Sequence, residues 1–196
     1  MSEFFIYLRL GYQHITDLNG LDHLLFLVAL CAVYSLLQWK EVLILVTAFT
    51  LGHSITLALA TQDILNVNSE FIEFLIPLTI ILTCLVNLFY KFKRNLYRSA
   101  SNPKWLRYSI ATLFGLIHGL GFSHYLKSLL GSENSILKPL LAFNIGLELG
   151  QILIVFVALI VNLLIISVLG LKKRTWNLIL SGVVMGMSLM LVIDKL

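Results

Sequence analysis

The strongest constraint in this sequence is a series of long apolar stretches separated by short polar segments. A membrane-spanning helix needs about 20 mainly apolar residues, and the stretches that qualify are residues 21–38, 42–60, 71–91, 107–127, 138–169 and 176–194. The chain is 59% hydrophobic and 12% charged, whereas soluble domains are roughly 45–50% apolar. The sequence therefore predicts an all-α integral membrane protein with six transmembrane helices in a single domain, residues 1–196.

The positive charges predict how this bundle is oriented. Residues 91–107 and 172–174 are rich in Lys and Arg, and we expect them on the cytoplasmic side, where such loops are enriched. Residues 61–73 contain acidic residues but no Lys or Arg, and we expect them outside. Both the N- and C-termini are then expected outside, with residues 1–20 forming an N-terminal segment at the membrane interface. The net charge of +4 reflects this topology, so no nucleic-acid partner is expected. The sequence also lacks a phosphate-binding P-loop motif, so no nucleotide is expected.

Two short motifs recur in the same order and predict an internal repeat. They are G-L-x-H-x-L at Gly20–Leu25 and Gly115–Leu120, and F-x-[LI]-G at Phe49–Gly52 and Phe143–Gly146. The step from the motif histidine to the motif glycine is 29 residues in the first copy and 28 in the second. Three spans per half is an odd number, so halves of about 20–91 and 107–194 would form a 3+3 inverted repeat with a site between them. Chance similarity in a Leu-rich sequence is the alternative.

Ionisable residues inside the predicted spans point to a site within the membrane. Each costs at least about 2.5–3.5 kcal/mol at the bilayer centre, and they are Asp22, His23, His53, His118 and Glu148. Imidazole and carboxylate ligands without Cys suit a divalent ion of nickel, cobalt or zinc. For each residue alone, an interhelical hydrogen bond is the alternative. His14 precedes the first span and is either an entry ligand or a solvated loop residue.

Other polar residues in the spans can form a second shell or a pathway for the ion. Asn144 and Gln151 share a helical face with Glu148, and Thr50 and Ser54 lie on the second span. Hydrogen bonding between helices is the competing interpretation of such residues. The third span has Asn87 as its buried polar residue and a kink expected at Pro77, and looks structural.

Four segments together resemble the HupE/UreJ family of membrane proteins: HITDLNGLDH from His14, TAFTLGHS from Thr47, FGLIHGLGF from Phe114 and FNIGLELGQ from Phe143. The resemblance covers nearly the whole chain. It implies a small secondary permease for nickel or cobalt, and we expect a multi-pass protein of a bacterial inner (cytoplasmic) membrane. The family signature of a His, a spacer and Asp-His maps onto His14, Asp22 and His23, with seven residues in the spacer where the family usually has five.

Transport of a divalent transition-metal ion is therefore the leading prediction, and an enzyme is not expected. In that interpretation the partners of the chain are the lipid bilayer and the metal ion, which is cargo. A zinc-dependent intramembrane hydrolase, with Glu148 activating a bound water, uses the same residues and remains an alternative. A metal-binding sensor or assembly subunit would bind the ion without flux.

Overall fold

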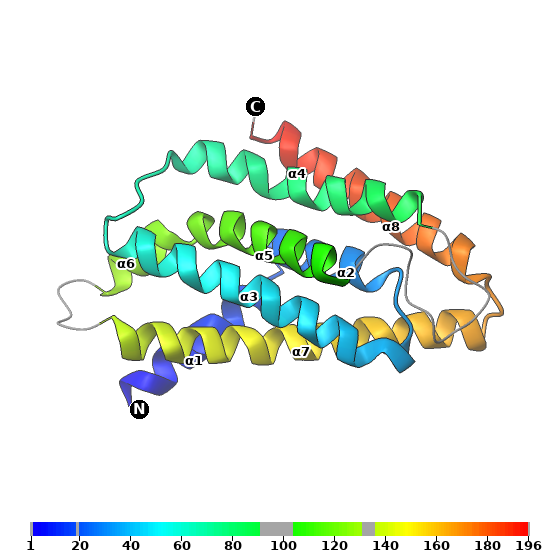
Figure 1. The fold of residues 1–196 in the computed structure, drawn as a ribbon, viewed down its shortest axis with the longest axis horizontal. Coiled ribbons are helices and arrows are strands. Elements are labelled where there is room, and N and C mark those ends of the chain that lie inside the picture. The colour runs from blue at the N-terminus through cyan, green and yellow to red at the C-terminus, as the bar shows by residue number, and fades with distance from the viewer. Residues whose placement is uncertain (1, 19, 91–103, 131–135, 196) are drawn as a thin grey trace.

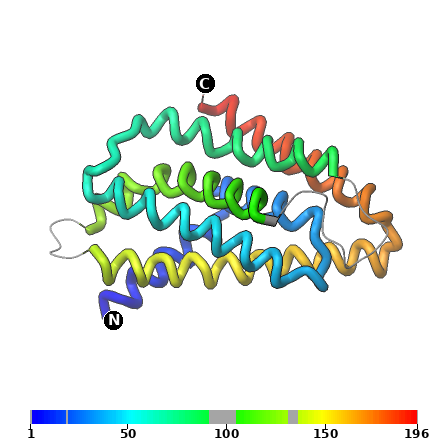
Figure 2. The backbone as a smooth tube through the Cα atoms, viewed as in Figure 1, coloured from blue at the N-terminus to red at the C-terminus, as the bar shows by residue number. Residues whose placement is uncertain are grey.

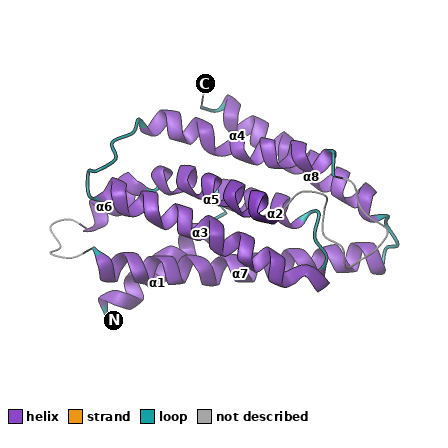
Figure 3. Cartoon of the chain, in the orientation of Figure 1, coloured by secondary structure: helices purple, strands orange, loops and turns teal. Residues whose placement is uncertain are grey.

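The chain forms a bundle of helices, and no strand occurs in the part of the chain that the structure describes (Figure 3). The computed structural model describes residues 2–18, 20–90, 104–130 and 136–195. The helices are α1 (Glu3–Thr16), α2 (Leu21–Cys31), the short 3₁₀ helix η1 (Leu36–Gln38), α3 (Trp39–Thr61), α4 (Ser69–Leu88), α5 (Lys104–Gly121), α6 (Ser123–Leu130), α7 (Leu137–Ser167) and α8 (Lys173–Ile193). The predicted all-helical class is confirmed.

The helices run back and forth along the long axis of the bundle (Figures 1 and 2). α1 runs inward from the end that holds the N-terminus, and α2 continues toward the opposite end. α3 then returns and α4 goes back again. In the second part of the chain α5, α7 and α8 run opposite to α1, α3 and α4, respectively. Most of the first basic segment expected on the cytoplasmic side, residues 91–103, is not among the residues that the structure describes.

Four helices in the described ranges are long and apolar enough to cross a membrane. These are α3 together with η1, α4, α7 and α8. The first predicted span, residues 21–38, is not one helix, because α2 ends at Cys31. The fourth, residues 107–127, is divided between α5 and α6 at Phe122. The long fifth stretch, in contrast, is one continuous helix of 31 residues. The six-span count therefore stays a prediction.

The break between α1 and α2 places polar residues in the middle of the bundle. Asp17 ends α1 in an extended conformation and Gly20 precedes α2. At the other end of α2, the carbonyl oxygens of Ala29 and Cys31 accept hydrogen bonds from the side-chain amides of Asn87 on α4 (2.7 Å) and Asn162 on α7 (2.9 Å). The same two oxygens also accept backbone N–H groups, of Ala32 (3.2 Å) and Tyr34 (3.0 Å) respectively, so the amides add a second hydrogen bond to each. α2 is thereby held in place by two long helices.

Glycines bring α3 and α5 into backbone contact. A Cβ atom at Gly52 would lie 2.2 Å from the carbonyl oxygen of Thr112, and one at Gly115 would lie 2.0 Å from that of Phe49. Real Cβ atoms do not approach a backbone oxygen so closely. Small residues permit this kind of close helix packing in membranes, so any side chain at either position would force these helices apart.

α1 and α7 are joined in the same way. A Cβ atom at Gly11 would lie 1.9 Å from the carbonyl oxygen of Phe143, and one at Gly146 would lie 1.9 Å from that of Leu8. The N-terminal segment that the sequence places at the membrane interface is therefore packed along α7 over the length of this contact. Its depth relative to the lipid stays a prediction.

The glycine contacts predict a difference between two Gly→Ala substitutions in helices. Alanine normally stabilises a helix relative to glycine by about 0.5–1 kcal/mol. Gly182→Ala on α8 meets nothing within 4 Å, so we expect an unchanged or raised melting temperature in detergent. Gly146→Ala must displace the α1 backbone and should lower the melting temperature, with a cost of about 1–3 kcal/mol. Equal melting temperatures for the two variants would contradict the backbone contact.

Candidate metal centre

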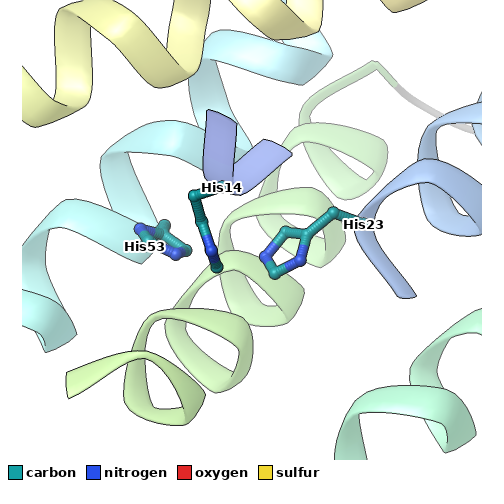
Figure 4. Close-up of side chains that lie close together, drawn as sticks. All are labelled: His14, His23 and His53. Atoms are coloured by element: carbon teal, nitrogen blue, oxygen red, sulfur yellow. The ribbon is translucent and has the colours of Figure 1, made fainter. Parts of the chain in front are cut away.

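Four histidines from four different helices meet inside the bundle. They are His14 on α1, His23 on α2, His53 on α3 and His118 on α5. The ring centroids of His14 and His23 are 4.7 Å apart, and those of His23 and His118 are 4.9 Å apart. His53 lies 6.0 Å from both His14 and His23. Figure 4 shows that the rings of His14, His23 and His53 lie close together, each on a different helix. The glycine contacts between α3 and α5 hold together the two helices that carry His53 and His118.

Most ring nitrogens of this cluster are buried without a hydrogen-bond partner in the protein. His53 and His118 are 0% exposed and His23 is 3% exposed. Nε2 of His14, Nε2 of His23, both ring nitrogens of His53 and Nδ1 of His118 have no hydrogen-bond partner. A buried polar atom without a partner costs about 1–3 kcal/mol. Such a concentration of unsatisfied donors and acceptors indicates a site for a ligand.

Two groups of these side chains have the spacing of metal ligands. One contains His14, His23 and His53, and the other contains Asp22, His23 and His118. Within each group, one donor atom from every residue lies within 4.8 Å of the others. Both groups can therefore converge on an ion with a small adjustment of their side chains.

Asp22 determines which nitrogen of His23 is free. Its Oδ1 accepts hydrogen bonds from the backbone N–H of His23 (2.9 Å) and from Nδ1 of the ring (3.0 Å). The ring then carries its proton on Nδ1 and leaves Nε2 with an available lone pair. A carboxylate in this position orients a metal-binding histidine and raises its basicity. Asp22 is therefore an orienting group for His23 in this arrangement. To bind an ion together with His23, its carboxylate would have to release Nδ1, and the ring would then bind the ion through that nitrogen.

Thr79 has the corresponding role for His118. Its hydroxyl oxygen lies 2.7 Å from the carbonyl oxygen of Ile76 and 3.0 Å from Nε2 of His118. A hydroxyl has one proton to donate, and the carbonyl can only accept it. Thr79 must therefore accept a hydrogen bond from Nε2–H of His118, so the neutral ring carries its proton on Nε2 and Nδ1 has a free lone pair. This is the nitrogen without a partner.

Phenylalanine rings surround the imidazoles. Phe122 lies 3.9 Å from His14 between ring centroids, Phe49 lies 5.1 Å from His118, and Phe143 is stacked on His53 at 6.4 Å. These rings remove the cluster from solvent. Electrostatic interactions between an ion and its ligands are stronger in such an apolar environment than in water.

The remaining predicted residues form polar pairs between α3 and α7. Thr47 donates a hydrogen bond of 2.9 Å to Oε1 of Glu148, and Thr50 donates one of 2.7 Å to Oε1 of Gln151. Gln151 is fully buried and its Nε2 has no partner. Among the described residues Glu148 belongs to neither ligand group, so its role as a ligand stays a prediction.

Two other predicted second-shell residues differ in their surroundings. The hydroxyl of Ser54 donates a hydrogen bond of 2.7 Å to the carbonyl oxygen of Thr50 within α3, so this hydroxyl is satisfied by its own helix. Asn144 on α7 has a buried Oδ1 without a partner, and so keeps an acceptor available for the proposed pathway.

The structure changes two interpretations of the sequence. His14 is in the last turn of α1 and contacts His23, so it is not in a solvated loop. Its long spacer to Asp22 spans the break between α1 and α2, where extra residues do not alter helical register. α4 is not only structural, because Thr79 contacts His118. A buried threonine two residues after Pro77, in an otherwise apolar run, was the available sequence signal for this contact.

Removal of the Thr79 hydroxyl tests its role in the centre. Thr79→Val keeps the volume of the side chain but releases the His118 ring, whereas Thr79→Ser keeps the hydroxyl. We expect Thr79→Val to weaken Co²⁺ binding by up to about tenfold, the lower end of the usual cost of losing an orienting partner of a ligand, and Thr79→Ser to bind like the original protein. Isothermal titration of the purified protein measures both. Equal weakening by Val and Ser would show that packing, not the hydrogen bond, is responsible.

Comparison with known proteins agrees with this architecture. The sequence profile of the family described as HupE / UreJ protein matches residues 1–194. No curated protein and no solved structure matches the chain. Apolar helices of membrane-spanning length, together with a match over essentially the whole chain, show an integral membrane protein. The chain therefore belongs to the HupE / UreJ family.

Proposed function

We propose that this protein is a secondary transporter of a divalent transition-metal ion, with nickel or cobalt as the cargo. The observation that carries the proposal is the cluster of four imidazoles, contributed by α1, α2, α3 and α5 and buried with unpartnered ring nitrogens. The bilayer and the ion are its partners, and a bacterial cytoplasmic membrane is its proposed location.

The donor set supports this choice of ion. Imidazole nitrogen suits nickel, cobalt and zinc, whereas a thiolate site would favour copper(I) or zinc, and magnesium or calcium would need oxygen ligands. Cys31 and Cys84, the cysteines of the chain, are buried and belong to neither ligand group. One carboxylate, from Asp22, accompanies the histidines.

The arrangement of the helices supports transport over hydrolysis. Discontinuous helices near the middle of the membrane are a recurring feature of secondary transporters, and the α1–α2 break lies next to His14 and His23. A metal hydrolase needs a carboxylate that activates the bound water without binding the metal. Glu148, the candidate for that role in the sequence, instead accepts a hydrogen bond from Thr47 on α3, and within the described residues no hydrogen bond joins it to a histidine of the cluster.

The polar pairs between α3 and α7 supply a route for the ion beside the cluster. Glu148 is partly exposed, while Gln151, one helical turn further along the same face, is fully buried. Free Nε2 of Gln151 and free Oδ1 of Asn144 lie along this interface. We assign these side chains to the pathway and the histidines to the binding centre.

Metal uptake into proteoliposomes tests the proposal. His53→Ala removes a fully buried ligand, and we expect uptake of nickel or cobalt to fall at least tenfold, toward that of protein-free vesicles. His124→Ala is the matched control, because His124 is exposed on α6 and belongs to neither ligand group. Its uptake should equal that of the original protein.

Both variants must elute as the original protein does in size-exclusion chromatography. Undiminished uptake by a folded His53→Ala protein would reject transport through this centre.

A further inference from the structure

We infer that the metal centre consists of two overlapping three-ligand stations that share His23, and that the ion is handed from one to the other. The first station is His14, His23 and His53, and the second station is Asp22, His23 and His118. This inference rests on the proposed transport function and describes how the same cluster performs it.

The ligand geometry separates the two stations. The donor atoms of each station lie within 4.8 Å of one another, but no group among the described residues contains both His14 and His118. The His23 ring lies between them, at 4.7 Å from His14 and 4.9 Å from His118. A single ion can therefore be held by one station at a time, with His23 in its shell in both cases.

The glycine contacts form the same pattern in two helix pairs, and this pattern shows how the two stations correspond. In α1 and α7, Gly11 meets the carbonyl oxygen of Phe143, and Gly146 meets that of Leu8. Each oxygen belongs to the residue three positions before the glycine of its own helix. The contact is thus reciprocal, with the same register on both helices.

α5 and α3 repeat this register without change. Gly115 meets the carbonyl oxygen of Phe49, and Gly52 meets that of Thr112, again three positions before each glycine. Because the contact is reciprocal, the shared Phe-x-x-Gly of α3 and α7 decides the correspondence: α7 corresponds to α3, and α1 therefore corresponds to α5. His14 follows Gly11 by three residues and His118 follows Gly115 by three residues, so the two histidines occupy equivalent positions.

The corresponding helices run in opposite directions along the bundle (Figure 1). The repeat is therefore inverted, and its register differs in one half from the one inferred from sequence. F-x-x-G at Phe49–Gly52 and Phe143–Gly146 is retained. The histidine motif becomes G-x-x-H at Gly11–His14 and Gly115–His118, in place of the match that begins at Gly20.

An inverted repeat explains why two stations would exist. Its halves exchange conformations when the transporter turns from one face of the membrane to the other. The equivalent ligands His14 and His118 would then bind the ion in opposite conformations of the transporter. His23 lies on α2, outside both copies of the motif, and can remain bound while the other ligands are exchanged. Weak, adjacent sites of this kind let an ion enter and also leave.

Co²⁺ binding in nanodiscs, followed by X-ray absorption and visible spectra, distinguishes two stations from one site. His14→Ala leaves the second station complete and His118→Ala leaves the first. We expect each variant to bind one Co²⁺ within about tenfold of the original affinity. The two spectra should differ, because only the second station contains a carboxylate. In proteoliposomes, both variants should lose at least tenfold in metal uptake, since each lacks one of the two stations.

Two further variants keep the test independent of folding defects. Thr79→Val leaves every ligand in place but disturbs the second station through His118, so its Co²⁺ spectrum should match that of His118→Ala. His124→Ala should resemble the original protein in both spectrum and uptake.

Loss of all Co²⁺ binding in either single variant would show one undivided site and overturn the inference. Undiminished uptake by either variant would overturn the hand-off. Binding by the original protein without any uptake would reject the proposed function, while the two variant spectra would still decide between one site and two.

Discussion

The backbone contacts at glycine determine the rest of this structure. Gly52 and Gly115 join α3 to α5, and Gly11 and Gly146 join α1 to α7, at distances that exclude any side chain. Because lipid is as apolar as the helices, close packing rather than hydrophobic burial holds such pairs together. His14, His53 and His118 each lie within one helical turn of a contact glycine. The precision of the centre therefore derives from the precision of helix packing.

Burial of the histidine cluster costs the folded protein free energy. Its unpartnered imidazole nitrogens lie among phenylalanine rings, and each carries a penalty of about 1–3 kcal/mol. Two hydrogen bonds determine which ring nitrogen carries the proton in His23 and in His118. Asp22 fixes the proton of His23, and Thr79 fixes that of His118. Both leave a lone pair directed away from the orienting group, which is the arrangement that a metal ion requires.

Much of the fold and of the centre could be predicted from the sequence. Apolar length identified a helical membrane protein, and the cost of burying charge selected Asp22, His23, His53, His118 and Glu148. The first four belong to the two ligand groups, and Glu148 does not. The helix breaks after Cys31 and at Phe122 were not predicted, because residues 21–38 and 107–127 are each apolar enough over their whole length to qualify as one span. Thr79 was missed because a threonine in an apolar helix usually bonds to its own backbone. Its second contact, to His118, depends on tertiary packing that no local pattern encodes.

The location of a bound ion is the most direct test of the account. Crystals of the protein soaked with Co²⁺ and measured at the cobalt absorption edge would give an anomalous peak. The account predicts this peak beside the His23 ring, within bonding distance of His14 and His53 or of Asp22 and His118. A peak confined to surface side chains such as His124, with an empty histidine cluster, would contradict it.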